Sequence, residues 1–139
     1  MTRTSPRDTL LRWLPFIASA VYSIAMSAAA PLGRHAFHFD WSLSADTLAI
    51  SLVKLPHIGT AALIALLAIW ATGRHRWLLA LVLTVAVGGA WELAQTTVIG
   101  HEARLADLLP DTMGALLGCA WGACGLWLLE PWRREGRLS

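Results

Sequence analysis

The chain has 139 residues, of which 56% are hydrophobic and only 14% are charged. Soluble domains are typically about 45–50% apolar and about 25% charged, so the composition argues against an ordinary soluble globule and against a disordered chain. The formal net charge is only +2, and no stripe of lysine and arginine suggests a nucleic-acid partner. A small integral membrane protein is the class that remains, with the lipid bilayer as its first expected partner.

Four stretches of the chain are long and apolar enough to cross a bilayer as helices, which takes about 20 residues. The windows 13–33, 55–73 and 112–129 contain no Asp, Glu, Lys or Arg, and the stretch at 77–99 contains only Glu92. The runs lack the alternation of barrel strands. We therefore predict one all-α domain over residues 1–139, a polytopic bundle of four transmembrane helices. The predicted spans cover about 13–33, 55–73, 77–99 and 110–129.

The first span has an alternative interpretation as a secretory signal. Three arginines precede an apolar stretch that ends in Ala28-Ala29-Ala30, as in a cleaved signal. The apolar run is longer than a typical signal core, however, and Pro31 directly follows the small residues. We therefore expect a retained helix.

Basic residues predict the orientation of the spans. Eight lie before the first span, between the second and third, or after the fourth, and three lie in the other connections. The positive-inside rule therefore places both termini in the cytoplasm. The eight are Arg3, Arg7, Arg12, Arg74, Arg76, Arg133, Arg134 and Arg137, and the three are Arg34, Lys54 and Arg104.

The connections between the spans are short, with one exception. Residues 72–76 are expected to form a tight turn, whereas residues 33–53 form the longest connection. Within it, residues 44–53 suit a short amphipathic helix that lies at the membrane interface and leads into the second span. Pro56 is expected to bend the chain there.

Polar side chains gather at the span ends that face the outer side. Two pairs at spacing i, i+3, Lys54 with His57 and Glu92 with Gln95, each share one helix face. Because successive spans alternate in direction, these pairs and the start of the fourth span reach the same membrane level, where we predict a ligand-binding cluster. The cluster consists of Lys54, His57, Glu92, Gln95, His101, Arg104, Asp107 and Asp111.

Glu92 has the weakest structural explanation in this cluster. A charge in hydrocarbon costs several kcal/mol unless it is paired or hydrated, so Glu92 is expected to face the bundle or a wet cavity, with Lys54 and Arg104 as the available cations. Structural alternatives stay open. Lys54 could extend to the interface, Asp107 could cap the fourth span, Asp111 could lie near the positive end of that helix, and Glu92 could belong to an ion pair.

The fourth span also carries a stripe of glycines on the face that holds its two aspartates. Such a smooth face permits close helix approach, and packing inside the bundle is its expected use. Gly88 and Gly89 are the expected contact partners, and homo-oligomerisation through the stripe is the alternative. The stripe consists of Gly114, Gly118, Gly122 and Gly125.

The order of these polar residues and glycines resembles the VanZ-like family of small bacterial membrane proteins. The matching pieces cover about half the chain, and three positions depart from the family pattern. Val53, His101 and Asp111 stand where the family often has Asp, Arg and Asn. The matching pieces are Lys54-x-x-His57, Glu92-x-x-Gln95, Gly100, Asp107 and Gly114-x-x-x-Gly118.

The resemblance implies a multi-pass protein of the bacterial inner (plasma) membrane that acts at the cell envelope. The family is named for a protein linked to resistance against the glycopeptide antibiotic teicoplanin. The resemblance supplies no reaction, and carrying antibiotic resistance to this chain would be an association only.

Three functions remain open. The favoured one is binding of a polar lipid headgroup, a lipid-linked envelope precursor or an amphiphilic antibiotic, with Lys54, His101 and Arg104 meeting anionic groups. This interpretation assigns no catalytic residue, metal or cofactor. An enzyme is the second, in which His57 and Glu92 act as an acid–base pair, or a divalent metal is held by these two residues with Asp107 and Asp111. The third is a structural subunit that docks a partner. The motif His35-x-x-His38 is too weak to count as a metal site.

Overall fold

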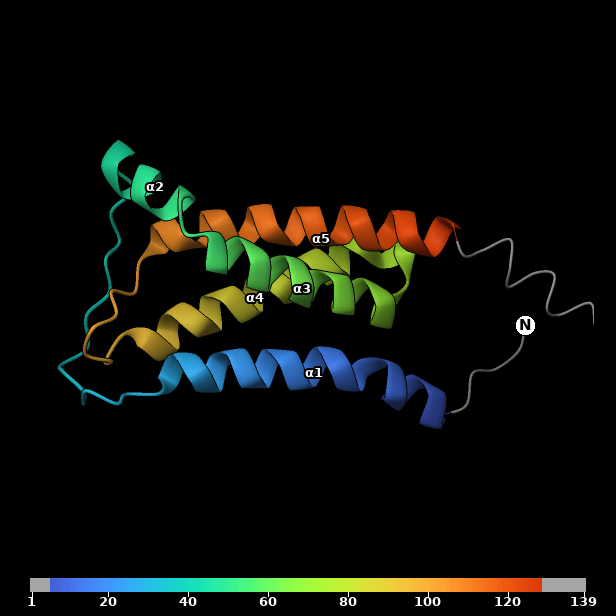
Figure 1. Cartoon of the computed structure of the whole chain (residues 1–139), viewed down its shortest axis with the longest axis horizontal. Coiled ribbons are helices and arrows are strands. Elements are labelled where there is room, and N and C mark those ends of the chain that lie inside the picture. Colours follow the sequence, from blue (N-terminus) through green and yellow to red (C-terminus); the bar gives the residue numbers. More distant parts are fainter. Residues whose placement is uncertain (1–5, 129–139) are drawn as a thin grey trace, which may run out of the picture.

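The computed structural model describes residues 6–128, which are helical with two isolated β-bridges and no named strand. The all-α prediction is therefore confirmed for this part of the chain. Arg3, Arg133, Arg134 and Arg137, which contribute to the predicted orientation, lie outside it. Figure 1 shows the long helices side by side along the long axis, with the short helix and the two longer connections at one end. The long helices are α1 (Pro6–Ala28), α3 (Leu55–Thr72), α4 (Trp77–Gln95) and α5 (Leu108–Leu128), and the short helix is α2 (Ala45–Leu52).

Large apolar side chains cover the outside of the long helices. Val82 on α4 is 57% exposed and Trp121 on α5 is 79% exposed. Exposed apolar surface of this extent marks a contact with lipid or protein. Three helices in the described part are long and apolar enough to cross a membrane. Their windows are Thr9–Ala28, Leu55–Thr72 and Arg74–Gln95. The helix α5, which carries Asp111, is not among them, so a fourth span stays a prediction.

Two predicted spans extend too far at their C-terminal ends. The helix α1 ends at Ala28 rather than near residue 33, because Pro31 disfavours helix in the residue before it and Gly33 has a φ of 98°. The helix α4 ends at Gln95 rather than at Ile99. The chain then turns through Gly100, whose φ of 89° suits glycine. The helices α3 and α5, which correspond to the second and fourth predicted spans, begin and end within two residues of the predicted limits.

The predicted tight turn and the short helix are both present. Gly73, with a φ of 88°, ends α3, and the 3₁₀ turn Arg74–Arg76 leads into α4. Ser44 caps α2 by accepting a hydrogen bond from the Thr47 amide at 3.2 Å. Pro56 lies in the first turn of α3, where its missing N–H removes no helical hydrogen bond. The interfacial position of α2 stays a prediction.

The long connection after α1 runs beside the connection after α4. Isolated bridges join Arg34 to Val98 and Asp40 to Arg104. The Asp40 amide donates to the Ala103 carbonyl at 2.9 Å. This docking brings residues 35–40 against the segment that contains His101 and Arg104.

The helix α5 packs in parallel on α3 through its glycines. A Cβ atom at Gly114 would lie 2.3 Å from the Ile58 carbonyl oxygen, and one at Gly118 would lie 2.1 Å from the Ala62 carbonyl oxygen. At Gly122 it would lie 2.1 Å from the Ile69 side chain. These distances are far below van der Waals contact, so only glycine permits the observed approach.

Two expectations about this stripe are wrong. The glycines approach α3, whereas Gly88 on α4 makes room for Asp111, whose Oδ2 would lie 2.5 Å from a Cβ at that position. Among the described residues, a Cβ at Gly89 or at Gly125 would meet no atom within 4 Å beyond the backbone of its own helix, so Gly125 does not extend the close contact. Since α3 covers the other three glycines within one chain, they are not available for homo-oligomerisation in this arrangement.

Candidate functional site

The first polar contact of the cluster joins the segment before α3 to the 3₁₀ turn Leu105–Asp107, directly before α5. The Lys54 Nζ lies 2.5 Å from Asp107 Oδ2, and the Ser51 hydroxyl donates to Asp107 Oδ1 at 2.6 Å. Asp107 is fully buried, whereas the Lys54 side chain is 30% exposed. Both carboxylate oxygens therefore have partners outside α5. Ion pairing, rather than helix capping or simple extension to the interface, describes these two residues.

The second contact lies one helical turn further along the same helix pair. The Nδ1 atom of His57 lies 3.1 Å from Asp111 Oδ1 and 3.9 Å from Glu92 Oε1. The indole of Trp91 stacks on the imidazole, with ring centroids 4.8 Å apart and an interplanar angle of 12°. Three helices thus bring one histidine and two carboxylates together, with the ring plane held by an aromatic neighbour.

Glu92 faces the protein interior and is 1% exposed. Its Oε2 accepts a hydrogen bond from the Arg104 backbone amide at 3.0 Å. The expectation that a Lys54 or Arg104 side chain neutralises Glu92 is not met by the observed contacts. The Arg104 guanidinium instead contacts Glu102 and lies 3.9 Å from Asp40, while Lys54 pairs with Asp107.

Two carboxylate oxygens in the buried part of the cluster accept no hydrogen bond from residues 6–128, the part that the structure describes. They are Glu92 Oε1 and Asp111 Oδ2, and both side chains are 1% exposed. Buried polar atoms are normally satisfied, because leaving one without a partner costs about 1–3 kcal/mol and more for a charged group. The arrangement is therefore set up to receive a hydrogen-bond donor or a cation.

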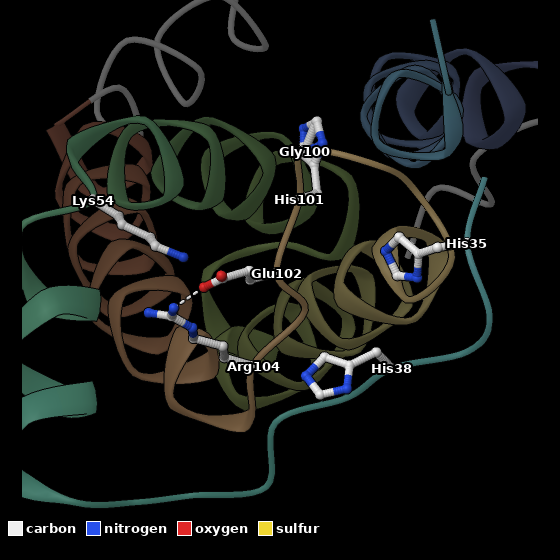
Figure 2. A pocket seen from close by; sticks show the side chains of 7 residues that line it. All are labelled: His35, His38, Lys54, Gly100, His101, Glu102 and Arg104. Atoms are coloured by element: carbon white, nitrogen blue, oxygen red, sulfur yellow. Dashed lines mark hydrogen bonds and ion pairs between the residues drawn. The ribbon is translucent and has the colours of Figure 1, made fainter. Parts of the chain in front are cut away.

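A basic pocket of about 590 Å³ opens at the same end of the molecule. Figure 2 shows Lys54, Glu102 and Arg104 pointing toward one another on one side, with His35 and His38 across from them on the docked loop. Five of the lining side chains carry nitrogen bases and one carries a carboxylate. The pocket is lined by His35, His38, Lys54, Gly100, His101, Glu102 and Arg104.

The charges around the pocket are partly compensated. The Ser42 backbone amide donates to Asp40 Oδ1 at 2.9 Å, and this bond, helped by the nearby Arg104, holds the pKa of the Asp40 carboxyl below its ordinary value. Asp40 therefore stays ionised close to Arg104. The Arg104 Nε is buried 3.9 Å from Asp40 Oδ2 and makes no hydrogen bond within the described residues.

A second cavity, of about 390 Å³, is almost entirely apolar. Phe39 lines it, and the preceding residue, His38, lines the basic pocket, so the two cavities flank one loop segment. Polar and apolar cavities thus adjoin at this end of the helices. The other lining residues are Ala86, Gly89, Ala90, Glu92, Leu93 and Leu108.

The predicted site residues divide into two groups. Lys54, Arg104 and the exposed His101 line the basic pocket, whereas the buried cluster lies between the helices. Gln95 is buried at the end of α4, where its carbonyl accepts the Val98 amide at 3.0 Å. The residues in the buried cluster are His57, Glu92 and Asp111, and Asp107 pairs with Lys54 beside it.

Sequence reasoning missed several residues of this end. The loop histidines His35 and His38 line the pocket, although their motif is too weak to indicate a site. Ser51 and Trp91 contact the cluster through a hydrogen bond and a ring stack. Trp91 could have been found from its position directly before Glu92 in the sequence. No spacing rule identifies His35, His38 or Ser51.

No family model matches the chain, and no curated protein and no solved structure matches it.

Proposed function

We propose that this chain is a multi-pass membrane protein that binds an anionic amphiphile at the polar end of its helices. The observation that carries the proposal is the basic pocket, where side chains with nitrogen donors outnumber carboxylates. Charge-assisted hydrogen bonds from arginine, lysine and histidine are the usual way in which proteins hold phosphate and carboxylate groups.

The donors that remain supply the headgroup contacts. Lys54 has three N–H donors, of which Asp107 engages one in the described contacts, and Arg104 lines the pocket with a second permanent cation. His35, His38 and His101 add imidazole donors from the two connecting loops. A phosphate group suits this set best, because it offers several acceptor oxygens to donors that converge from different directions.

The neighbouring apolar cavity supports an amphiphilic rather than a purely polar ligand. Its lining by Phe39, Leu93 and Leu108 suits a hydrocarbon chain that enters from the lipid side of α4. A lipid or lipid-linked envelope precursor with a phosphate headgroup therefore fits both cavities. The glycopeptide-type antibiotic rests on the family resemblance alone.

The membrane arrangement belongs to the same proposal. Four spans, with α5 as the fourth, would leave both termini in the cytoplasm of a bacterial cell and the basic pocket on the outer side of the plasma membrane. The beginning of α1 and the end of α5 lie at the end opposite α2, as an even number of spans requires (Figure 1). The VanZ-like resemblance agrees with this arrangement.

A binding titration tests the proposal. The full chain in nanodiscs of zwitterionic phosphatidylcholine is titrated calorimetrically with short-chain phosphatidic acid, with short-chain phosphatidylcholine and inorganic phosphate as comparison ligands. We expect saturable binding of phosphatidic acid. Arg104→Gln should weaken it about tenfold or more, because a hydrogen bond to a charged group contributes about 1.5–3 kcal/mol.

The opposite end of the molecule supplies matched controls. Arg76→Gln and His75→Gln change exposed residues in the turn between α3 and α4, and both should leave the affinity unchanged. His38→Gln, in the pocket, should weaken binding when His75→Gln does not. Equal affinities for Arg104→Gln and Arg76→Gln, in proteins of unchanged thermal stability, would contradict the proposed pocket.

A further inference from the structure

We propose that His57, Glu92 and Asp111 form a binding site for one divalent transition-metal ion, separate from the basic pocket. Each residue offers one ligand atom, and these three atoms all lie within 4.8 Å of one another. They come from α3, α4 and α5, so the packing of three helices creates the site. This inference does not depend on lipid binding.

The distances suit a single ion. Metal–ligand bonds of about 2.0–2.2 Å place two ligands of one tetrahedral ion about 3.3–3.5 Å apart. The His57 Nδ1 lies 3.1 Å from Asp111 Oδ1 and 3.9 Å from Glu92 Oε1, which brackets that separation. Because the three ligand atoms spread over up to 4.8 Å, the two carboxylates would have to rotate inward to complete the coordination.

Electrostatics provides the second, independent observation. Glu92 Oε1 and Asp111 Oδ2 are buried without hydrogen-bond partners. The nearby permanent cations contact other acids, since Lys54 pairs with Asp107 and Arg104 contacts Glu102 and Asp40. One imidazole thus faces two buried carboxylates, and a divalent ion would supply the missing positive charge.

Neighbouring residues hold the ligands in position. The Arg104 amide binds Glu92 Oε2 and leaves Oε1 for the His57 side, and the Trp91 ring stacks on the imidazole. Gly88 leaves room for Asp111, since a side chain there would collide with its carboxylate. Such outer contacts, which orient the ligands, are typical of metal sites.

The donor set defines the class of ion. One imidazole nitrogen with two carboxylate oxygens suits Zn²⁺, Mn²⁺ or Fe²⁺, whereas Mg²⁺ and Ca²⁺ prefer oxygen ligands alone. Thiolate does not contribute, because Cys119 contacts the Trp77 carbonyl further along α5. Three protein ligands leave a coordination position for water or a ligand group.

Metal titration of the full chain in detergent is the experiment. After treatment with a chelator, the protein is titrated calorimetrically with Zn²⁺ and with Mn²⁺, and bound metal is counted by mass spectrometry. We expect about one ion per chain and a rise in the Tm of several degrees. His57→Gln, Glu92→Gln and Asp111→Asn should each weaken binding at least about tenfold, whereas the control His75→Gln should not.

The stability of the isosteric variants separates a metal site from a simple ion pair. At a metal site, Glu92→Gln and Asp111→Asn remove buried negative charge, so the metal-free variants should be as stable as the metal-free parent or more stable, and lose the metal-dependent rise in Tm. Lower Tm values for both metal-free variants, with no effect of metal on the parent, would show an ion-pair network and overturn the proposal.

The loop histidines provide the remaining control. A double variant, His35→Gln with His38→Gln, should retain stoichiometric metal binding, because neither residue belongs to the site. Binding lost in this variant but kept in Glu92→Gln would place the ion in the basic pocket and overturn the proposal. Absence of stoichiometric binding by the parent for either ion would also overturn it.

Discussion

The two halves of the interface between α3 and α5 are built from different interactions. Toward the loops, Lys54 pairs with Asp107 and His57 with Asp111, so acid–base contacts join the helices. Further along, Gly114 and Gly118 bring the α5 backbone against the carbonyls of α3. In one half of this parallel helix pair, close packing fixes how the two helices are aligned along their axes. In the other half, that alignment places the ionisable groups of the two helices opposite one another.

The largest effect is expected in the packed half. Gly118→Leu should destabilise the protein by more than about 3 kcal/mol, since its Cβ would lie 2.1 Å from the Ala62 carbonyl oxygen and backbone cannot yield as a side chain can. Gly125→Leu is the control on the same helix, because no other described part of the chain lies within 4 Å of its Cβ, and it should change the free energy of unfolding by about 0.5 kcal/mol or less. Reversible unfolding in mixed micelles measures both. Similar losses in the two variants would refute the close contact.

A smaller effect is expected in the polar half. Lys54→Met should lower the free energy of unfolding by about 3 kcal/mol, because it leaves the Asp107 carboxylate buried without its cation. This value is at the low end for a buried ion pair because the lysine side chain is partly exposed. The double variant Lys54→Met with Asp107→Asn should recover most of the loss. The same unfolding assay checks this, and additive losses would show that the two side chains act independently.

The difference between the halves also explains what the sequence can predict. Apolar runs identify all four long helices, and alternating chain direction correctly places Lys54 and His57 near Asp107 and Asp111. The predicted spans continue past the helix ends at Ala28 and Gln95, because Ala29-Ala30 and Thr96-Thr97 carry no charge that would end a span. The positions at which these two helices end depend instead on the turns that follow them.

Side-chain partners are harder to predict than proximity. The Arg104 guanidinium lies near Asp40, to which its backbone is bridged, and no periodic pattern signals such a bridge. The same docking brings His35 and His38 to the pocket. Likewise, the glycine stripe predicts close packing, but the partner helix depends on how all the helices assemble.

The central claim is that the helices cross the membrane with the polar end of the molecule outside, and a labelling experiment tests it most directly. His101→Cys and His75→Cys place a thiol at an exposed site at opposite ends of the helices, in a chain whose exposed Cys124 is replaced by Ala. In intact bacterial cells, a membrane-impermeant maleimide should label the thiol at position 101 and should reach the one at position 75 only after permeabilisation. Labelling of both thiols from outside, or of the thiol at position 75 alone, would contradict a membrane-spanning protein with its polar end outside.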